Sequence, residues 1–148
     1  MQLKAEGNEV KREVFRIIDA NLNRSREGLR VCEDITRFIL NSPRLTKELK
    51  AVRHSVTNLA RPNLLRSGCA VESRDVMGDV GRSSKRKSEM QRRNTADVFC
   101  ANIERVKESL RVLEEFFKLI DKKTSSGYSR LRFRTYEIER KAMGRLLR

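Results

Sequence analysis

The stretch ANLNRSREGLRVCEDITRFI, residues 20–39, decides the fold because the chain contains it twice. Displaced by 81 residues, it aligns with ANIERVKESLRVLEEFFKLI, residues 101–120. Nine of the 20 aligned positions are identical: Ala20/Ala101, Asn21/Asn102, Arg24/Arg105, Glu27/Glu108, Leu29/Leu110, Arg30/Arg111, Val31/Val112, Glu33/Glu114 and Ile39/Ile120. An internal repeat indicates one structural unit that is used twice.

Each copy has the apolar spacing of an amphipathic helix. Apolar and small residues recur three and four positions apart through 10–39, with Asn8 as the expected N-cap, and again through 95–120. A shorter helix follows each copy. The Ser-Pro start signal predicts one from residue 43 to about 60, and a polar break predicts another over about 128–147.

Two such hairpins bury their apolar faces only by packing together, so we expect an all-α helical bundle with a pseudo-twofold axis. The chain has 148 residues, which suits a single domain spanning 1–148. Its repeat halves are expected at about 8–60 and 89–147. The connection at about 61–88 is long for a bundle, which favours a functional loop.

Charge and composition narrow the function classes. Lys and Arg number 34 against 20 Asp and Glu, and the net charge of +14 favours an anionic partner. Aromatic residues make up 5% with no Trp, which argues against a nucleic-acid partner because stacking platforms are scarce. No apolar run is long enough for a membrane span, so we expect no membrane partner and a cytoplasmic location. We expect Cys32 and Cys100 to be small buried residues.

A set of three polar side chains occurs in both copies of the repeat. The sets are Asn21, Arg24 and Glu27, and Asn102, Arg105 and Glu108. On a helical wheel the set runs from the apolar face to its edge. Either the sets fix helix register and form ordinary helix pairs, or they converge on one polar cleft that holds a phosphate. Gly28 beside them fits a close helix crossing or room for a ligand.

The connection contains RDVMGDVGRSS, residues 74–84. Backbone N–H groups at Gly78 and Gly81 can turn toward a phosphate, and Asp75 and Asp79 can hold a bridging Mg²⁺. Asp and Gly together also make plain turns. The basic run KRKSEMQRR that follows, residues 85–93, fits a solvated helix start or a nucleic-acid patch.

Several motifs carry a family resemblance. They are IDANLNRSREGLRV at 18–31, Arg53-His54, Arg74-Asp75 with GDVG at 78–81, Glu89 with Arg92, and the second copy through 101–115. Together they resemble the small hydroxymethylpyrimidine phosphate kinase family of thiamine biosynthesis, often fused ahead of thiamine-phosphate synthase. The resemblance covers about 17–139. No synthase barrel follows before residue 148, so the chain resembles the stand-alone form.

The resemblance implies an ATP-dependent kinase that transfers a phosphoryl group, assisted by Mg²⁺, onto hydroxymethylpyrimidine phosphate. A phosphate oxygen as acceptor needs no general base. We expect Asp75 and Asp79 to hold Mg²⁺ and Arg74, Arg92, Gly78 and Gly81 to receive phosphates. We expect Asn21, Arg24, Asn102 and Arg105 to line the pyrimidine phosphate pocket, with Glu27 and Glu108 orienting the arginines.

Two other functions fit the sequence. One is a non-catalytic domain that associates with a separate thiamine-phosphate synthase, and the other is a basic helical module that binds RNA. The nucleotide donor and the oligomeric state, a homodimer included, are open at this point. So is whether the cleft lies within one chain or between two.

Overall fold

The computed structural model describes the backbone of residues 2–67, 77–82 and 91–148, and side chains in these ranges from residue 11 onward except at residue 67. Within these residues the chain forms four long helices and no strands: α1 (Gln2–Asp34), α2 (Pro43–Ser67), α3 (Thr95–Phe117) and α4 (Lys122–Leu146). A π-helical turn, η1 (Ile35–Ile39), extends α1. The predicted all-α class is confirmed.

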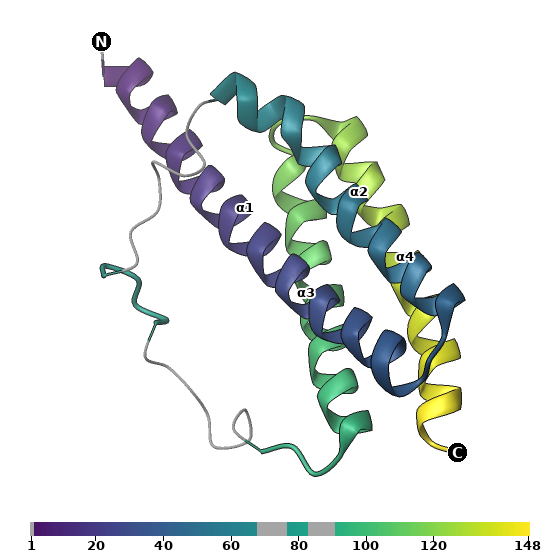
Figure 1. The fold of residues 1–148 in the computed structure, drawn as a ribbon. Coiled ribbons are helices and arrows are strands. Elements are labelled where there is room, and N and C mark those ends of the chain that lie inside the picture. Colours follow the sequence, from purple (N-terminus) through teal and green to yellow (C-terminus); the bar gives the residue numbers. More distant parts are fainter. Residues whose placement is uncertain (1, 68–76, 83–90) are drawn as a thin grey trace.

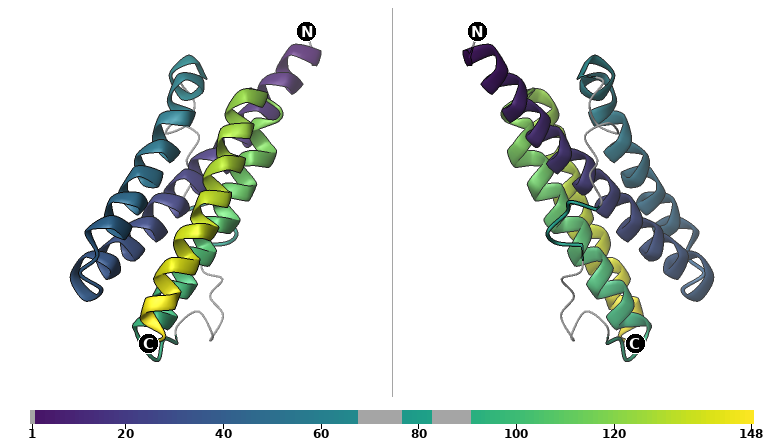
Figure 2. Two further views of the ribbon diagram at one scale, coloured as in Figure 1. Left: turned by 90° about the vertical axis from the view of Figure 1, so that its right-hand side faces the viewer. Right: turned by 90° about the vertical axis from the view of Figure 1, so that its left-hand side faces the viewer.

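Each long helix is followed by a helix that packs along it (Figure 1). Helix α1 contacts α2 and α3, and α4 contacts α3 and α2, so the two hairpins join through both their long and their short helices. Figure 2 shows α3 and α4 side by side with α1 crossing them. This is the arrangement of two repeated hairpins that the sequence predicts.

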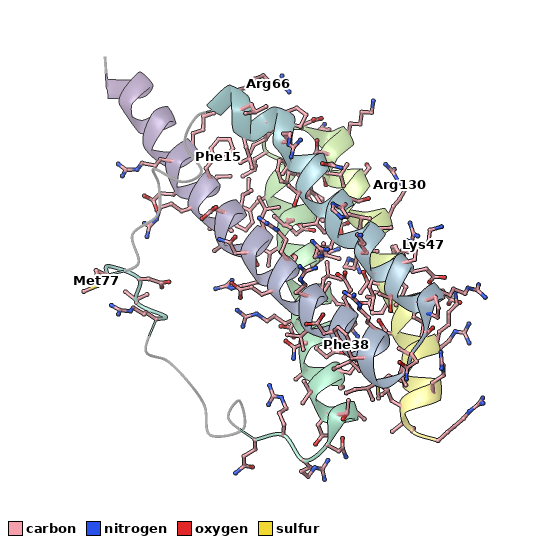
Figure 3. All side chains as sticks on the ribbon, in the orientation of Figure 1. Phe15, Phe38, Lys47, Arg66, Met77 and Arg130 are labelled. Carbon is pink, nitrogen blue, oxygen red and sulfur yellow. The ribbon has the colours of Figure 1, made fainter. Side chains whose placement is uncertain are left out.

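The core is built from matching positions of the two copies. Leu29 and Leu110, one residue pair of the repeat, are both fully buried, and so are Cys32 and Leu113. Phe15 points from α1 toward the other helices and is only 1% exposed (Figure 3). Burial of such apolar side chains is the main stabilising contribution to the bundle.

Helices α1 and α3 pack closely against each other at Gly28. A Cβ atom there would lie 2.9 Å from the carbonyl oxygen of Asn102 and 2.8 Å from Cγ2 of Val106. One turn away, the hydroxyl groups of Ser25 and Ser109 are 2.7 Å apart. Gly28 therefore serves the helix crossing, which is one of the two interpretations that the sequence left open.

Two predicted helix boundaries are wrong. Helix α2 does not end near residue 60 but continues through Pro62, because Asn63 is buried and donates to Thr124 at the start of α4. Helix α4 begins at Lys122 rather than near residue 128, with Asp121 as its N-cap. Tertiary contacts override the breaker signals of Pro and of the polar stretch 121–127.

The ends of the repeat also differ from expectation. Asn8 lies inside α1 rather than capping it. At the far end, η1 leads to Asn41, whose φ of 50° is the left-handed conformation that Asn tolerates. Helix α3 begins only at Thr95, where the side chain of Asn94 accepts a hydrogen bond from the N–H of Asp97.

Candidate functional site

A hollow of about 640 Å³, lined mostly by polar residues, lies beside the middle of α1. Its lining residues come from α1, from α3 and from the segment 77–82, and we call it the α1 hollow: Glu13, Arg16, Ile17, Asp19, Ala20, Asn21, Asn23, Arg24, Asp79 and Val112. Three residues that the sequence predicts for the site, Asn21, Arg24 and Asp79, thus line one hollow.

Asn21 anchors one wall of the α1 hollow. It is 3% exposed, and its Nδ2 donates to the carbonyl oxygen of Ile17 at 2.8 Å. Its Oδ1 accepts a hydrogen bond from Nη1 of Arg24 at 3.4 Å. Asn21 therefore orients Arg24, and the guanidinium keeps further N–H donors for a ligand.

The charges of the α1 hollow are mixed. Arg16 forms an ion pair with Glu13, with 3.2 Å between Nη1 and Oε2. Asp19 lies in the same hollow and is 8% exposed. Arginines are suited to bind a phosphate, and carboxylates to accept hydrogen bonds from a ring amine. The hollow therefore offers groups for both ends of a small zwitterionic or phosphorylated heterocycle.

The segment 77–82 forms a turn around Asp79. The Oδ1 atom of Asp79 accepts a hydrogen bond from the N–H of Gly81 at 2.9 Å, and the carbonyl of Asp79 accepts one from Arg82. This is the Asx turn expected of Asp with Gly. Asp79 nevertheless lines the α1 hollow, while Gly78 and Gly81 are exposed.

The other predicted residues of the connection lie elsewhere. Arg74 and Asp75 fall outside the described residues. Arg92 is exposed, donates to the carbonyl oxygen of Gln91 at 2.8 Å, and does not line the α1 hollow. In the described part of the chain no group of three His, Cys, Asp or Glu side chains could hold a metal ion. The Mg²⁺ site at Asp75 and Asp79 stays a prediction.

The second polar set does not join the first. Asn102 repeats the local hydrogen bond of Asn21, donating to the carbonyl oxygen of Val98 at 2.8 Å. Arg105 pairs with Glu27 of the other copy, with 3.7 Å between Nη2 and Oε2. Neither these residues nor the exposed Glu108 line the α1 hollow. The two copies therefore share local geometry without converging there.

Sequence reasoning missed two buried ion pairs between long and short helices. In the first hairpin, Nε of Arg53 lies 2.8 Å from Oε2 of Glu33. In the second, Nη2 of Arg132 lies 3.0 Å from Oε2 of Glu114. The identity of Glu33 and Glu114 in the repeat was the available signal. Because each glutamate is less than a tenth exposed, these pairs hold the hairpins together rather than bind a ligand.

A second charged cluster connects α3 to α4. The ammonium group of Lys107 contacts Glu104 and lies 2.7 Å from Oε2 of Glu139. Burial opposes the charged form of Lys107, but the hydrogen bonds to the two glutamates outweigh it and raise its pKa. Lys107 therefore stays protonated and does not act as a base.

The cysteines differ from each other. Cys32 is fully buried, as expected, and burial, with the nearby charge of Glu139, raises its pKa to about 12. Its thiol is therefore inert at neutral pH. Cys100 is exposed, which contradicts the expected burial.

The fold and the α1 hollow define an all-helical repeat domain with a recess lined mostly by polar residues. Comparison with known proteins identifies its family. The ThiD2 family model matches residues 16–141, and the chain belongs to this family.

Three similar relatives are all named thiamine-phosphate synthase. The chain is 36% identical over 95% of its length to a thiamine-phosphate synthase of Nostoc punctiforme, and 39% identical over 95% to one of Nostoc sp.. It is 38% identical over 93% to one of Rhodopirellula baltica. The chain spans only 38%, 38% and 37% of these relatives. No solved structure matches the chain.

These findings correct the expected family and activity. The resemblance pointed to a hydroxymethylpyrimidine phosphate kinase, but the matching family is ThiD2 and the relatives are named thiamine-phosphate synthase. The kinase assignment is therefore wrong.

None of the helices in the described part of the chain has the length and apolar character of a membrane span.

Proposed function

We propose that this chain acts in thiamine biosynthesis as a non-catalytic helical partner domain of a thiamine-phosphate synthase. The observation that carries the proposal is the alignment of 95% of this chain with 38% of the Nostoc punctiforme protein of that name. Most of each relative lies outside the match. We therefore assign the synthase reaction to that remainder and a non-catalytic role to the helical domain.

The α1 hollow is the proposed ligand site of this domain. Its volume of about 640 Å³ suits a small molecule. Arg24, held by Asn21, and Arg16 would bind a phosphate group, while the carboxylate of Asp19 would accept hydrogen bonds from a pyrimidine ring. We propose that the α1 hollow binds a small phosphorylated pyrimidine while the domain is in complex with the synthase.

The test combines the purified chain with thiamine-phosphate synthase from the same organism. Calorimetry should detect a complex, and size-exclusion chromatography should show the two proteins eluting together. Incubation of the chain alone with ATP, Mg²⁺ and hydroxymethylpyrimidine phosphate should yield no diphosphate. The absence of a complex would contradict the partner role, and formation of the diphosphate would contradict the non-catalytic role.

A further inference from the structure

Helix α4 exposes an aromatic pair on its outer face. Phe133 is 61% exposed and Tyr136 is 42% exposed. Their ring centroids lie 6.1 Å apart, with 47° between the ring planes. Exposed aromatic side chains next to one another are a typical feature of protein–protein interfaces.

The pair is fixed by two cations beneath it. The guanidinium of Arg132 lies 4.9 Å from the Phe133 ring centroid, and the ammonium of Lys107 lies 4.9 Å from that of Tyr136. Both cations are themselves anchored, Arg132 by Glu114 and Lys107 by two glutamates. The rings therefore lie against the charged clusters that join α3 to α4. Because these contacts already restrict the two rings, little of their side-chain entropy is lost when a partner covers them.

The repeat does not require this pair. In α2, which is the counterpart of α4, there is no Phe, Tyr or Trp. Because the pairs Glu33–Arg53 and Glu114–Arg132 match, His54, the residue after Arg53, stands where Phe133 follows Arg132. Both positions are exposed, but the first hairpin has an imidazole there and no aromatic neighbour in α2. A feature that one copy has and the other lacks is not needed for the bundle itself.

The surroundings of the pair are basic. Arg130 and Arg134 are exposed on α4 at either side of Phe133, and the exposed Glu137 is neutralised by Arg140 at 2.7 Å. Together with the net charge of +14, this favours a partner surface with carboxylates around an apolar recess.

We infer that the outer face of α4 around Phe133 and Tyr136 is the docking surface for the thiamine-phosphate synthase. This inference rests on the proposed function and adds the place of contact. The relatives support the choice of partner, because a domain of this kind forms 38% of a longer protein of that name. The rings enter the apolar recess, and the arginines meet its acidic border.

The chain provides a matched control. Phe38 is 65% exposed and lies under Arg37, whose guanidinium is 4.8 Å from the ring centroid. It therefore resembles Phe133 in exposure and in its cation, but it lies in η1, between α1 and α2, and not on α4. Figure 3 shows Phe38 at the end of α1.

The experiment measures the affinity of the full chain for the synthase by calorimetry. Phe133→Ala should weaken binding about tenfold or more, as truncation of a hot-spot aromatic does. Phe38→Ala should stay within about twofold, because it lies outside the docking surface. Arg134→Glu, an exposed substitution, should also weaken binding, and high salt should reduce its effect.

The outcomes separate this inference from the proposed function. If the unaltered chain binds and Phe133→Ala and Arg134→Glu behave like Phe38→Ala, the docking surface is wrong and the partner role stands. If the unaltered chain does not bind, both are wrong. If Phe133→Ala instead dissociates a homodimer without changing synthase affinity, a second copy covers this face and the inference is overturned. Circular dichroism of each variant checks that it is folded.

Discussion

The two hairpins of this protein share the ion pairs that hold each long helix to its short helix, but they differ in what they contribute to the α1 hollow. Glu33 holds Arg53 in the first hairpin as Glu114 holds Arg132 in the second. The α1 hollow, in contrast, is lined by Asn21 and Arg24 of the first polar set and by no residue of the second. Shared residues of the repeat therefore build the bundle in both hairpins, whereas the α1 hollow combines shared residues such as Arg24 with unshared ones such as Asp19.

Individual positions show how the copies diverged. Asp19 lines the α1 hollow, and its counterpart in the second copy is the exposed Cys100. Asn23 lines the hollow too, whereas its counterpart Glu104 pairs with Lys107. The same helical position thus lines the α1 hollow in one hairpin and belongs to a network of ion pairs between α3 and α4 in the other.

The largest effect should come from breaking the duplicated ion pairs. Glu33→Gln and Glu114→Gln each leave an arginine that is mostly buried without its carboxylate, and each should cost about 2 to 3 kcal/mol of unfolding free energy. Urea denaturation measures this. Glu115→Gln, whose partners Arg111 and Lys118 are half exposed, should cost under about 1 kcal/mol. A large loss in one hairpin alone would contradict their equivalence.

The helix crossing should be the next most sensitive feature. Gly28→Ala places a Cβ against a backbone carbonyl of α3, and it should destabilise the protein by about 1 to 3 kcal/mol despite its better helix propensity. Gly144→Ala meets no atom within 4 Å and should be neutral or stabilising by up to about 1 kcal/mol. Thermal unfolding of both variants measures the difference, and equal melting temperatures would refute the close crossing.

A smaller effect should separate the two arginines of the repeat. Arg24→Gln removes a donor from the α1 hollow and should weaken binding of hydroxymethylpyrimidine phosphate about tenfold, which corresponds to about 1.4 kcal/mol. Arg105→Gln makes the same charge change outside the hollow and should alter affinity by less than about twofold. Calorimetric titration compares them. Equal losses would mean that both copies contribute to the site.

The smallest expected effect is an unchanged alkylation rate of Cys100 when a ligand is added. Cys100 takes the place of Asp19 in the second copy, so a ligand bound only in the α1 hollow should leave its alkylation rate unchanged. Mass spectrometry of the labelled peptides at pH 8 follows each cysteine. Cys32 should react only on unfolding, because burial raises its pKa to about 12 and keeps it protonated. Protection of Cys100 by the ligand would show binding at the second copy.

The sequence was sufficient for the fold because the repeat places apolar residues at helical spacing in both copies. It failed at helix ends, where local signals compete with tertiary contacts. Pro62 marks a helix end by itself, but the hydrogen bonds of Asn63 to α4 carry α2 onward. Gly127 is likewise a loop signal, yet it is buried in α4, where a Cβ would lie 2.7 Å from Leu59.

The site was only partly predictable for a related reason. Asn21 and Arg24 were found because the repeat preserves them, and Asp79 because of its glycine neighbours. Arg16 and Asp19 were missed because the second copy does not retain them, although they line the same hollow. A repeat highlights only what two halves share, whereas this recess also depends on residues that they do not share.

The association with thiamine-phosphate synthase is the central claim, and its most direct measurement is a calorimetric titration of the full chain into that enzyme. The account predicts a saturable complex of defined stoichiometry, with no diphosphate produced by the chain when ATP, Mg²⁺ and hydroxymethylpyrimidine phosphate are supplied. No detectable heat of binding at micromolar protein, or diphosphate formed by the chain alone, would contradict it.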